Sequence, residues 1–97
     1  MSVTILLRMR VKEESIAAFE ESFAAMLPET RAYDGCRGVT VQRQLDAPTT
    51  YWIFEQWDSK EHYERYLQWR NESGTLGTLA ETLSEPPALS FLDPVGM

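Results

Sequence analysis

A tryptophan, two tyrosines and an arginine fall close together in the second half of the chain. Tyr63, Tyr66 and Arg70 are three and four residues apart, so a helix here places all three on one face. Trp57 closes the preceding predicted strand. We therefore expect these four side chains to line one cleft between the helices and the sheet. Because its guanidinium does not deprotonate, Arg70 is the candidate for binding an anionic oxygen of a ligand.

His62 is the one histidine of the chain, and Cys36 is the one cysteine. One histidine and one cysteine are too few for an ordinary zinc site made from Cys and His. The sequence also has no G-x-S-x-G segment, so His62 does not suggest a serine hydrolase. There is no Gly-rich phosphate loop either, so we expect no metal and no cofactor. His62 lies in the first turn of a predicted helix, where the dipole disfavours a cation. We expect it to be neutral, either as an acid–base group or simply exposed.

Length and charge narrow the class of protein further. Ninety-seven residues predict a single domain over 1–97, and a net charge of -6 without a Lys/Arg cluster argues against a nucleic-acid partner. Apolar runs such as Val3–Leu7 are too short to cross a membrane, and the N-terminus does not resemble a secretion signal. A cytoplasmic location is the resulting expectation.

Two periodicities divide the chain into strands and helices. Period-two alternation predicts these strands: Val3–Val11, Cys36–Asp46, Thr50–Trp57 and Ala88–Leu92. Helical spacing predicts these helices: Glu13–Tyr33, Asp58–Asn71 and Leu76–Leu83. Pro28 should kink or end the first helix, and Asp58, three residues before Glu61, should cap the second. This order predicts an α+β fold of the ferredoxin-like split βαβ type, with an antiparallel sheet covered by helices on one face.

The third predicted strand is apolar on both faces. Tyr51 and Ile53 point one way, and Trp52 and Phe54 point the other way. Helices on one side would leave the second apolar face exposed, and such patches mark protein interfaces. We therefore expect a homodimer in which a second copy covers that face.

The stretch from Phe54 to Tyr63, with its Gln-Trp-Asp-Ser core, and the preceding Asp34-Gly35-Cys36 turn resemble the antibiotic biosynthesis monooxygenase family, also called quinol monooxygenase-like proteins. The resemblance implies a dimeric α/β barrel made of two ferredoxin-like sheets. It also implies a cofactor-independent monooxygenase that oxidises a small phenolic or quinol-type aromatic with O₂.

The resemblance also bears on individual residues. Trp57 matches a tryptophan that lines the substrate pocket, and Ile53 stands where those oxygenases have an asparagine. In haem-degrading relatives, the positions of Leu7, Tyr66 and the Gly77 region hold an asparagine, a tryptophan and a ligand histidine, so the resemblance argues against haem degradation. The candidate catalytic residues are Trp57 from this resemblance, and His62 and Arg70 from their residue types and positions. The candidate substrate-binding residues are Leu7, Tyr51, Ile53, Tyr63 and Tyr66.

The same residues could instead have purely structural roles. Trp57 and the tyrosines are equally typical of a hydrophobic core, and Arg70 is placed for a surface salt bridge to Glu64 or Glu72. Glu55 is expected to meet Arg8 and Arg10 inside the dimer barrel as a structural group. A non-catalytic dimer that binds a small planar ligand, or an accessory protein of the same fold, is the alternative to an enzyme.

Overall fold

The computed structural model describes residues 2–97 as one four-stranded sheet with three α-helices on one side. The strands are β1 (Val3–Arg10), β2 (Cys36–Arg43), β3 (Thr50–Trp57) and β4 (Ala88–Leu92). The helices are α1 (Ile16–Ala32), α2 (Lys60–Glu72) and α3 (Thr75–Ala80), with a 3-10 turn at Glu13–Ser15 before α1. The order across the sheet is β2-β3-β1-β4, and all neighbours are antiparallel. The predicted α+β, ferredoxin-like fold is confirmed.

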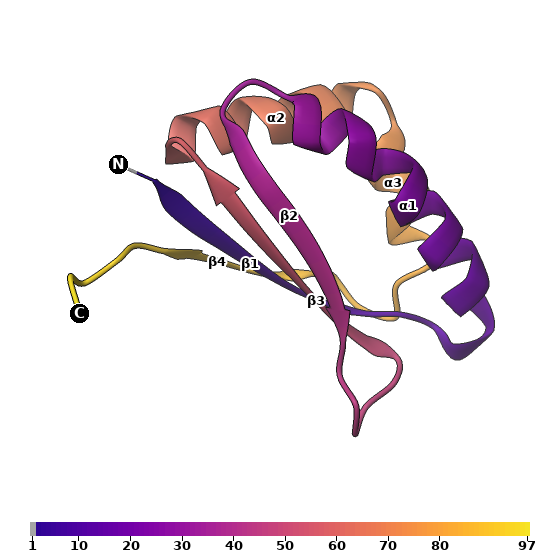
Figure 1. The fold of residues 1–97 in the computed structure, drawn as a ribbon. Coiled ribbons are helices and arrows are strands. Elements are labelled where there is room, and N and C mark those ends of the chain that lie inside the picture. Colours follow the sequence, from indigo (N-terminus) through magenta and orange to yellow (C-terminus); the bar gives the residue numbers. More distant parts are fainter. Residues whose placement is uncertain (1) are drawn as a thin grey trace.

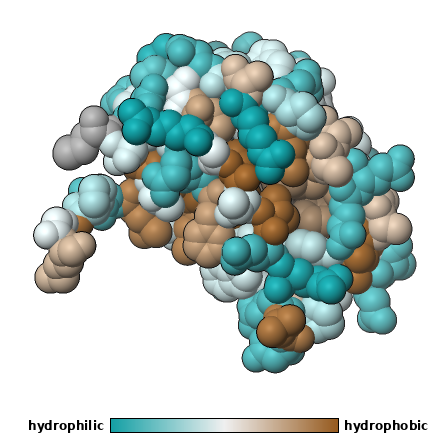
Figure 2. Space-filling view, in the orientation of Figure 1, coloured by the Kyte–Doolittle hydropathy of each residue, from teal (hydrophilic) through white to brown (hydrophobic). Residues whose placement is uncertain are grey.

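The helices form an arch over a single face of the sheet (Figure 1). Hydrophobic side chains gather between the arch and the strands, whereas the outer surface of the helices is largely hydrophilic (Figure 2). The opposite face of the sheet has no covering element among residues 2–97, and the sheet is open. One chain therefore does not form the expected barrel by itself. No helix in this range has the length and apolar content needed to cross a membrane.

Strand register places the core on the helix side of the sheet. Leu7 pairs with Ile53 and Ile5 pairs with Glu55, so these side chains share the covered face. Ile5 and Ile53 are fully buried there and belong to one hydrophobic cluster with Phe19 of α1. Their burial against α1 fixes which face of the sheet is dry.

Pro28 does not end α1, which continues to Ala32. Met26 and Thr30 flank the proline and are buried, at 8% and 4% exposure. Arg70 of α2 donates to the Met26 carbonyl at 2.9 Å and to Thr30 Oγ1 at 3.0 Å. Tertiary contacts on both sides therefore hold the helix together across a residue that lacks a backbone donor.

The N-cap of α2 is Ser59 rather than the predicted Asp58. Ser59 Oγ accepts a hydrogen bond from the backbone N–H of His62 at 3.2 Å, as an N-cap side chain does. Asp58 is instead paired with Arg37 of β2. Both residue types cap helices well, so the sequence did not distinguish them.

Gly35 lies in the turn before β2 and packs against the first turn of α2. Its φ is +90°, a conformation that a side chain disfavours, and its carbonyl accepts from the N–H of Asp58 at 2.8 Å. A Cβ at Gly35 would lie 2.5 Å from Cγ of His62. The turn, the end of β3 and the start of α2 thus meet where a glycine is required.

We expect Gly35→Ala to lower the free energy of unfolding by about 2 kcal/mol or more, because the left-handed backbone and the contact with His62 both oppose a methyl group. Urea unfolding provides the measurement. The control is Gly77→Ala in α3, where a Cβ meets nothing within 4 Å and where alanine should stabilise the helix by roughly 0.5 to 1 kcal/mol. Equal stability of Gly35→Ala and wild type would contradict this account of the turn.

Candidate functional site

A cavity of about 320 Å³ lies between the helix-facing side of the sheet and the helical arch. Its wall is formed by these residues of the sheet, the helices and the segment leading to β4: Leu7, Met9, Phe23, Met26, Glu55, Tyr63, Tyr66, Leu67, Leu76, Leu79, Ala80, Leu83, Pro87 and Leu89. Apart from Glu55 and two tyrosines, the lining is apolar. Its volume lies at the lower end of the range for small-molecule sites.

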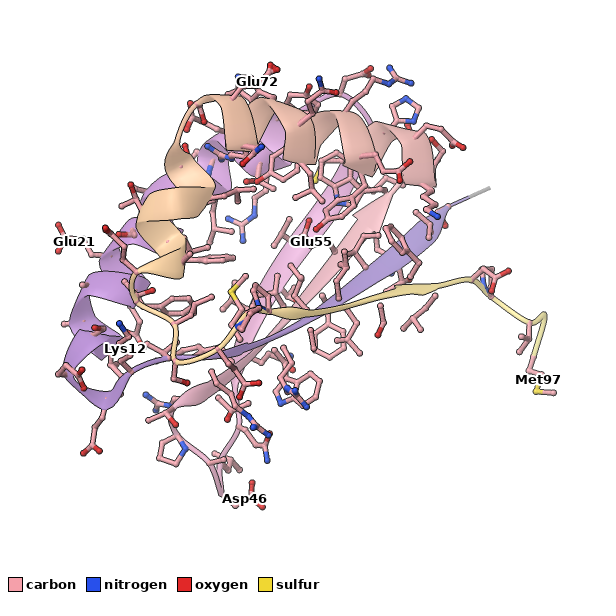
Figure 3. All side chains as sticks on the ribbon, turned by 180° about the vertical axis from the view of Figure 1, so that it is seen from behind. Lys12, Glu21, Asp46, Glu55, Glu72 and Met97 are labelled. Carbon is pink, nitrogen blue, oxygen red and sulfur yellow. The ribbon has the colours of Figure 1, made fainter. Side chains whose placement is uncertain are left out.

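Glu55 is the one carboxylate in this wall, and it is 4% exposed. Figure 3 shows it on the side of the sheet that faces the helices. The indole N–H of Trp57 donates to Glu55 Oε1 at 2.9 Å. Two residues apart on one strand, the two side chains lie on the same face. Burial raises the pKa of the Glu55 carboxyl above its ordinary value of 4.5, and the bond from Trp57 opposes this rise.

Trp57 is fully buried behind Glu55 in an aromatic cluster, and it does not line the cavity. Its ring centroid lies 5.0 Å from that of Tyr66, 5.6 Å from that of Tyr63 and 6.2 Å from that of Tyr33. The tryptophan therefore reaches the cavity indirectly, through the carboxylate that it holds and the tyrosines that it supports.

Tyr63 and Tyr66 come from the inner face of α2 and both line the cavity. The hydroxyls of Tyr66 and Thr30 share a hydrogen bond of 2.6 Å, and Tyr66 Oη accepts another from Arg70 Nε at 3.0 Å. Burial raises the pKa of both tyrosines, and the charge of Glu55 adds to this rise, so both stay protonated at neutral pH. Tyr66 presents its ring to the cavity, while its oxygen is held by the protein.

The guanidinium of Arg70 is buried, at 2% exposure, and is engaged by protein groups. Besides Tyr66 it donates to Thr30 Oγ1 and to the Met26 carbonyl, and it lies 3.3 Å from Glu29 Oε1. Glu29, not Glu64 or Glu72, is thus its ionic partner. Arg70 borders a separate hollow between α1, α2 and α3, so it does not share the cavity with the tyrosines as expected.

The other predicted site residues are distributed around the cavity. Leu7 lines it, whereas Ile53 is fully buried in the core beside it. Tyr51 borders a different groove, against α1, and its hydroxyl donates to Glu20. His62 lies outside, in the first turn of α2, where its Nδ1 is 2.6 Å from Ser59 Oγ.

The predicted contact of Glu55 with Arg8 and Arg10 is wrong, because Glu55 lies on the covered face of the sheet. Arg8 and Arg10 project from the uncovered face of the sheet, where both approach Glu85. A sequence signal for the actual position did exist. Glu55 alternates in phase with Ile53 and Trp57, so it belongs to the buried face, where an acidic residue calls for a specific reason.

Metal ligands do not gather in the described part of the chain. Between residues 2 and 97, no three His, Cys, Asp or Glu side chains are grouped closely enough to hold a metal ion. What the cavity offers chemically is an apolar space with a carboxylate and two tyrosines in its wall.

Comparison with known proteins identifies the family. The model of the antibiotic biosynthesis monooxygenase family matches residues 2–73, which is more than half of the chain. The chain belongs to this family. The matched segment contains β1, α1, β2, β3 and α2, and hence Glu55, Trp57 and both cavity tyrosines. No curated protein matches the chain in sequence.

Solved structures from several organisms show the same fold. Rv0793 from Mycobacterium tuberculosis is 24% identical, with 100% of this chain and 98% of that chain covered, at a TM-score of 0.83. SnoaB from Streptomyces nogalater, described as a cofactor-independent oxygenase, is 19% identical, with 99% of this chain and 95% of that chain covered, at a TM-score of 0.84. A conserved protein from Methanosarcina mazei is 17% identical, with 95% of this chain and 91% of that chain covered, at a TM-score of 0.87. At these identities the likeness concerns the fold alone.

The environment of Arg70 predicts a large effect on stability. Arg70→Ala should lower the free energy of unfolding by about 3 kcal/mol, because it removes the charged donor that bonds the buried Met26 carbonyl and Thr30 hydroxyl. Denaturant unfolding measures the change. Arg37→Ala is the control, since its pair with Asp58 is exposed and contributes little. A stability of Arg70→Ala close to that of wild type would show that the guanidinium is available for other partners.

Proposed function

We propose that this protein is a cofactor-independent monooxygenase that oxidises a small phenolic or quinol-type aromatic with O₂. The observation that carries the proposal is the apolar cavity with a buried carboxylate and a buried phenol in its wall. Membership of the antibiotic biosynthesis monooxygenase family supports it, as does a structural relative described as a cofactor-independent oxygenase.

The chemistry suits such a cavity. Triplet O₂ reacts slowly with closed-shell organic molecules, but an ionised phenol or quinol can give it an electron. A protein that uses this route binds the ring, keeps water away and favours the ionised form of the substrate. Leu7, Tyr63 and Tyr66 are the predicted substrate-binding residues that we place against the ring, because they line the cavity. Trp57 and Arg70 act indirectly, through Glu55 and Tyr66.

Oxygen consumption tests the activity. We expect the purified protein to accelerate O₂ uptake in the presence of at least one member of a panel of hydroquinones, naphthols and anthrones, with saturation as the aromatic is increased. An O₂ electrode and product analysis by mass spectrometry are the measurements. Heat-denatured protein and chelator-treated protein are the controls. Saturable binding of the panel without any O₂ uptake would instead support a non-catalytic ligand-binding protein.

We also propose that the protein works as a homodimer joined through the uncovered face of the sheet. Phe54 and Leu92 lie on that face at 39% and 44% exposure, and Leu6 and Trp52 are only partly covered there. An apolar strip of this kind, in the middle of a sheet, favours a second sheet as its cover. A cytoplasmic location stays a prediction from the sequence.

Sedimentation tests the dimer. Wild type should sediment as a dimer at micromolar concentration, and Phe54→Glu should shift it toward the monomer, because a charge would be buried in the proposed interface. Leu45→Glu makes the same change at a residue that is 97% exposed in the β2–β3 connection, and it should leave the dimer intact. A wild-type monomer would contradict the proposal, as would equal dimerisation of the two variants.

A further inference from the structure

One carboxylate oxygen in the cavity wall has no hydrogen-bond partner in the described part of the chain. Glu55 makes one side-chain hydrogen bond among residues 2–97, through Oε1 to Trp57. In the same residues, every fully buried side-chain nitrogen or oxygen has a hydrogen-bond partner. Oε2 has none, so it is not fully enclosed by these residues, and the cavity that Glu55 lines is the space available to it. The same reasoning applies to the hydroxyl of Tyr63, which is 1% exposed and makes no hydrogen bond within the described chain.

The charges around Glu55 do not explain why it is there. No cation is among the groups that shift its pKa, and the lysines and arginines are absent from the cavity wall. The titratable groups that face it are Tyr63 and Tyr66 of α2 and Cys36 of β2, whose pKa values its charge raises. The surfaces of β1, α1 and α3 in the wall are apolar. A buried carboxylate without an ionic partner destabilises the folded state, which is typical of a group kept for function.

The surroundings of Glu55 suit proton transfer. Its pKa is raised by burial, which makes the carboxylate a stronger base than an exposed glutamate. Tyr63 keeps its proton because burial raises its pKa as well, so its hydroxyl is available as a donor. An acceptor and a donor therefore open onto one apolar cavity. A hydroxyl on an aromatic ring complements both, since it gives a proton and then carries the negative charge.

We propose that Glu55 is the general base of this site, that it takes the proton of the reacting hydroxyl through Oε2, and that Trp57 is a positioning residue that holds Oε1. This inference rests on the proposed function and names a catalytic residue for it. The substrate O–H bond breaks, the proton goes to Oε2, and the electron pair stays on the substrate oxygen, where Tyr63 donates a hydrogen bond to it. The negative charge moves from protein to substrate, so the cavity gains no charge.

The later steps balance with O₂ as the oxidant. The phenolate and O₂ combine to a peroxide on a ring carbon that carries a hydrogen. That hydrogen leaves the carbon as a proton and goes to the outer peroxide oxygen, the O–O bond breaks, and the inner oxygen stays as a carbonyl. Glu55 then returns its proton to the departing hydroxide. One oxygen atom stays on the ring and the other leaves as water. For a hydroquinone the product is a hydroxyquinone, and the substrate supplies all of the electrons. No other reductant is required.

Glu55→Gln tests the base directly, because it keeps the shape of the side chain and the acceptor for Trp57. With a substrate that is neutral at the assay pH, kcat/KM should fall by roughly 100-fold or more. With a phenol acidic enough to be ionised before it binds, kcat/KM should fall by less than about 10-fold, since no base is then needed. Glu64→Gln, an exposed site on α2, is the matched control and should behave like wild type.

The pH profile separates positioning from packing. In wild type the acidic limb of kcat/KM should report the ionisation of Glu55, and this limb should be absent in Glu55→Gln. Trp57→Phe removes the N–H that favours the ionised carboxylate, so the limb should move to higher pH. A purely structural tryptophan would lower stability and activity without moving the limb.

Stability gives a readout that does not need a substrate. Because the folded-state pKa of Glu55 is raised, wild type loses stability as pH rises from the ordinary value of 4.5 through the folded value. The Tm of Glu55→Gln minus the Tm of wild type should therefore be near zero at pH 4 and should increase toward pH 8.

The outcomes separate this inference from the function on which it rests. Oxygen uptake by wild type with an equally active Glu55→Gln would overturn the base and leave the oxygenase in place. A Tm difference that does not change with pH would also overturn it, because Glu55 would then not be a buried, unpaired acid. Failure of wild type to consume O₂ with every aromatic tested would overturn both proposals.

Discussion

A buried guanidinium joins the two long helices of this protein and determines how the cavity is shaped. Arg70 reaches from α2 to the Met26 carbonyl and the Thr30 hydroxyl of α1, and it also holds Tyr66. It thereby fixes the spacing of α1 and α2, and this spacing leaves a cavity over the sheet. The remaining wall follows from the alternation of β1 and β3, whose inner faces are fixed by burial against α1.

The site combines a rigid support with a few polar groups that have unfulfilled hydrogen-bonding capacity. Trp57 is fully buried among aromatic rings, and it fixes one oxygen of Glu55 through a bond between residues on one face of β3. Tyr66 is fixed by Arg70 and Thr30, whereas the hydroxyl of Tyr63 is not. Groups without partners in a dry cavity are expensive to maintain, so their placement on a central strand and a capped helix favours a binding role.

The sequence was sufficient for the architecture because period-two and helical spacing report burial directly. It also brought Tyr63 and Tyr66 to one face of α2. It did not predict the direction of Arg70, because a helical stripe has two flanks and only tertiary packing shows that this side chain turns toward α1. Glu55 was assigned to the wrong face because its charge suggested the nearby arginines, although its phase with Ile53 and Trp57 indicated the core. The sequence also does not show that α1 continues through Pro28, because contacts from α2 keep that helix intact.

The position of β4 has a consequence for how molecules reach the cavity. It is an edge strand of five residues, it pairs with β1 alone, and all of its residues are exposed, yet Leu89 belongs to the cavity wall. Releasing it breaks one short ladder and leaves β1, β2 and β3 paired, so its local opening should cost less free energy than separation of the longer strands. Amide hydrogens of β4 should exchange sooner than those of β3, and an opening of this strand would uncover the part of the cavity wall that Leu89 forms.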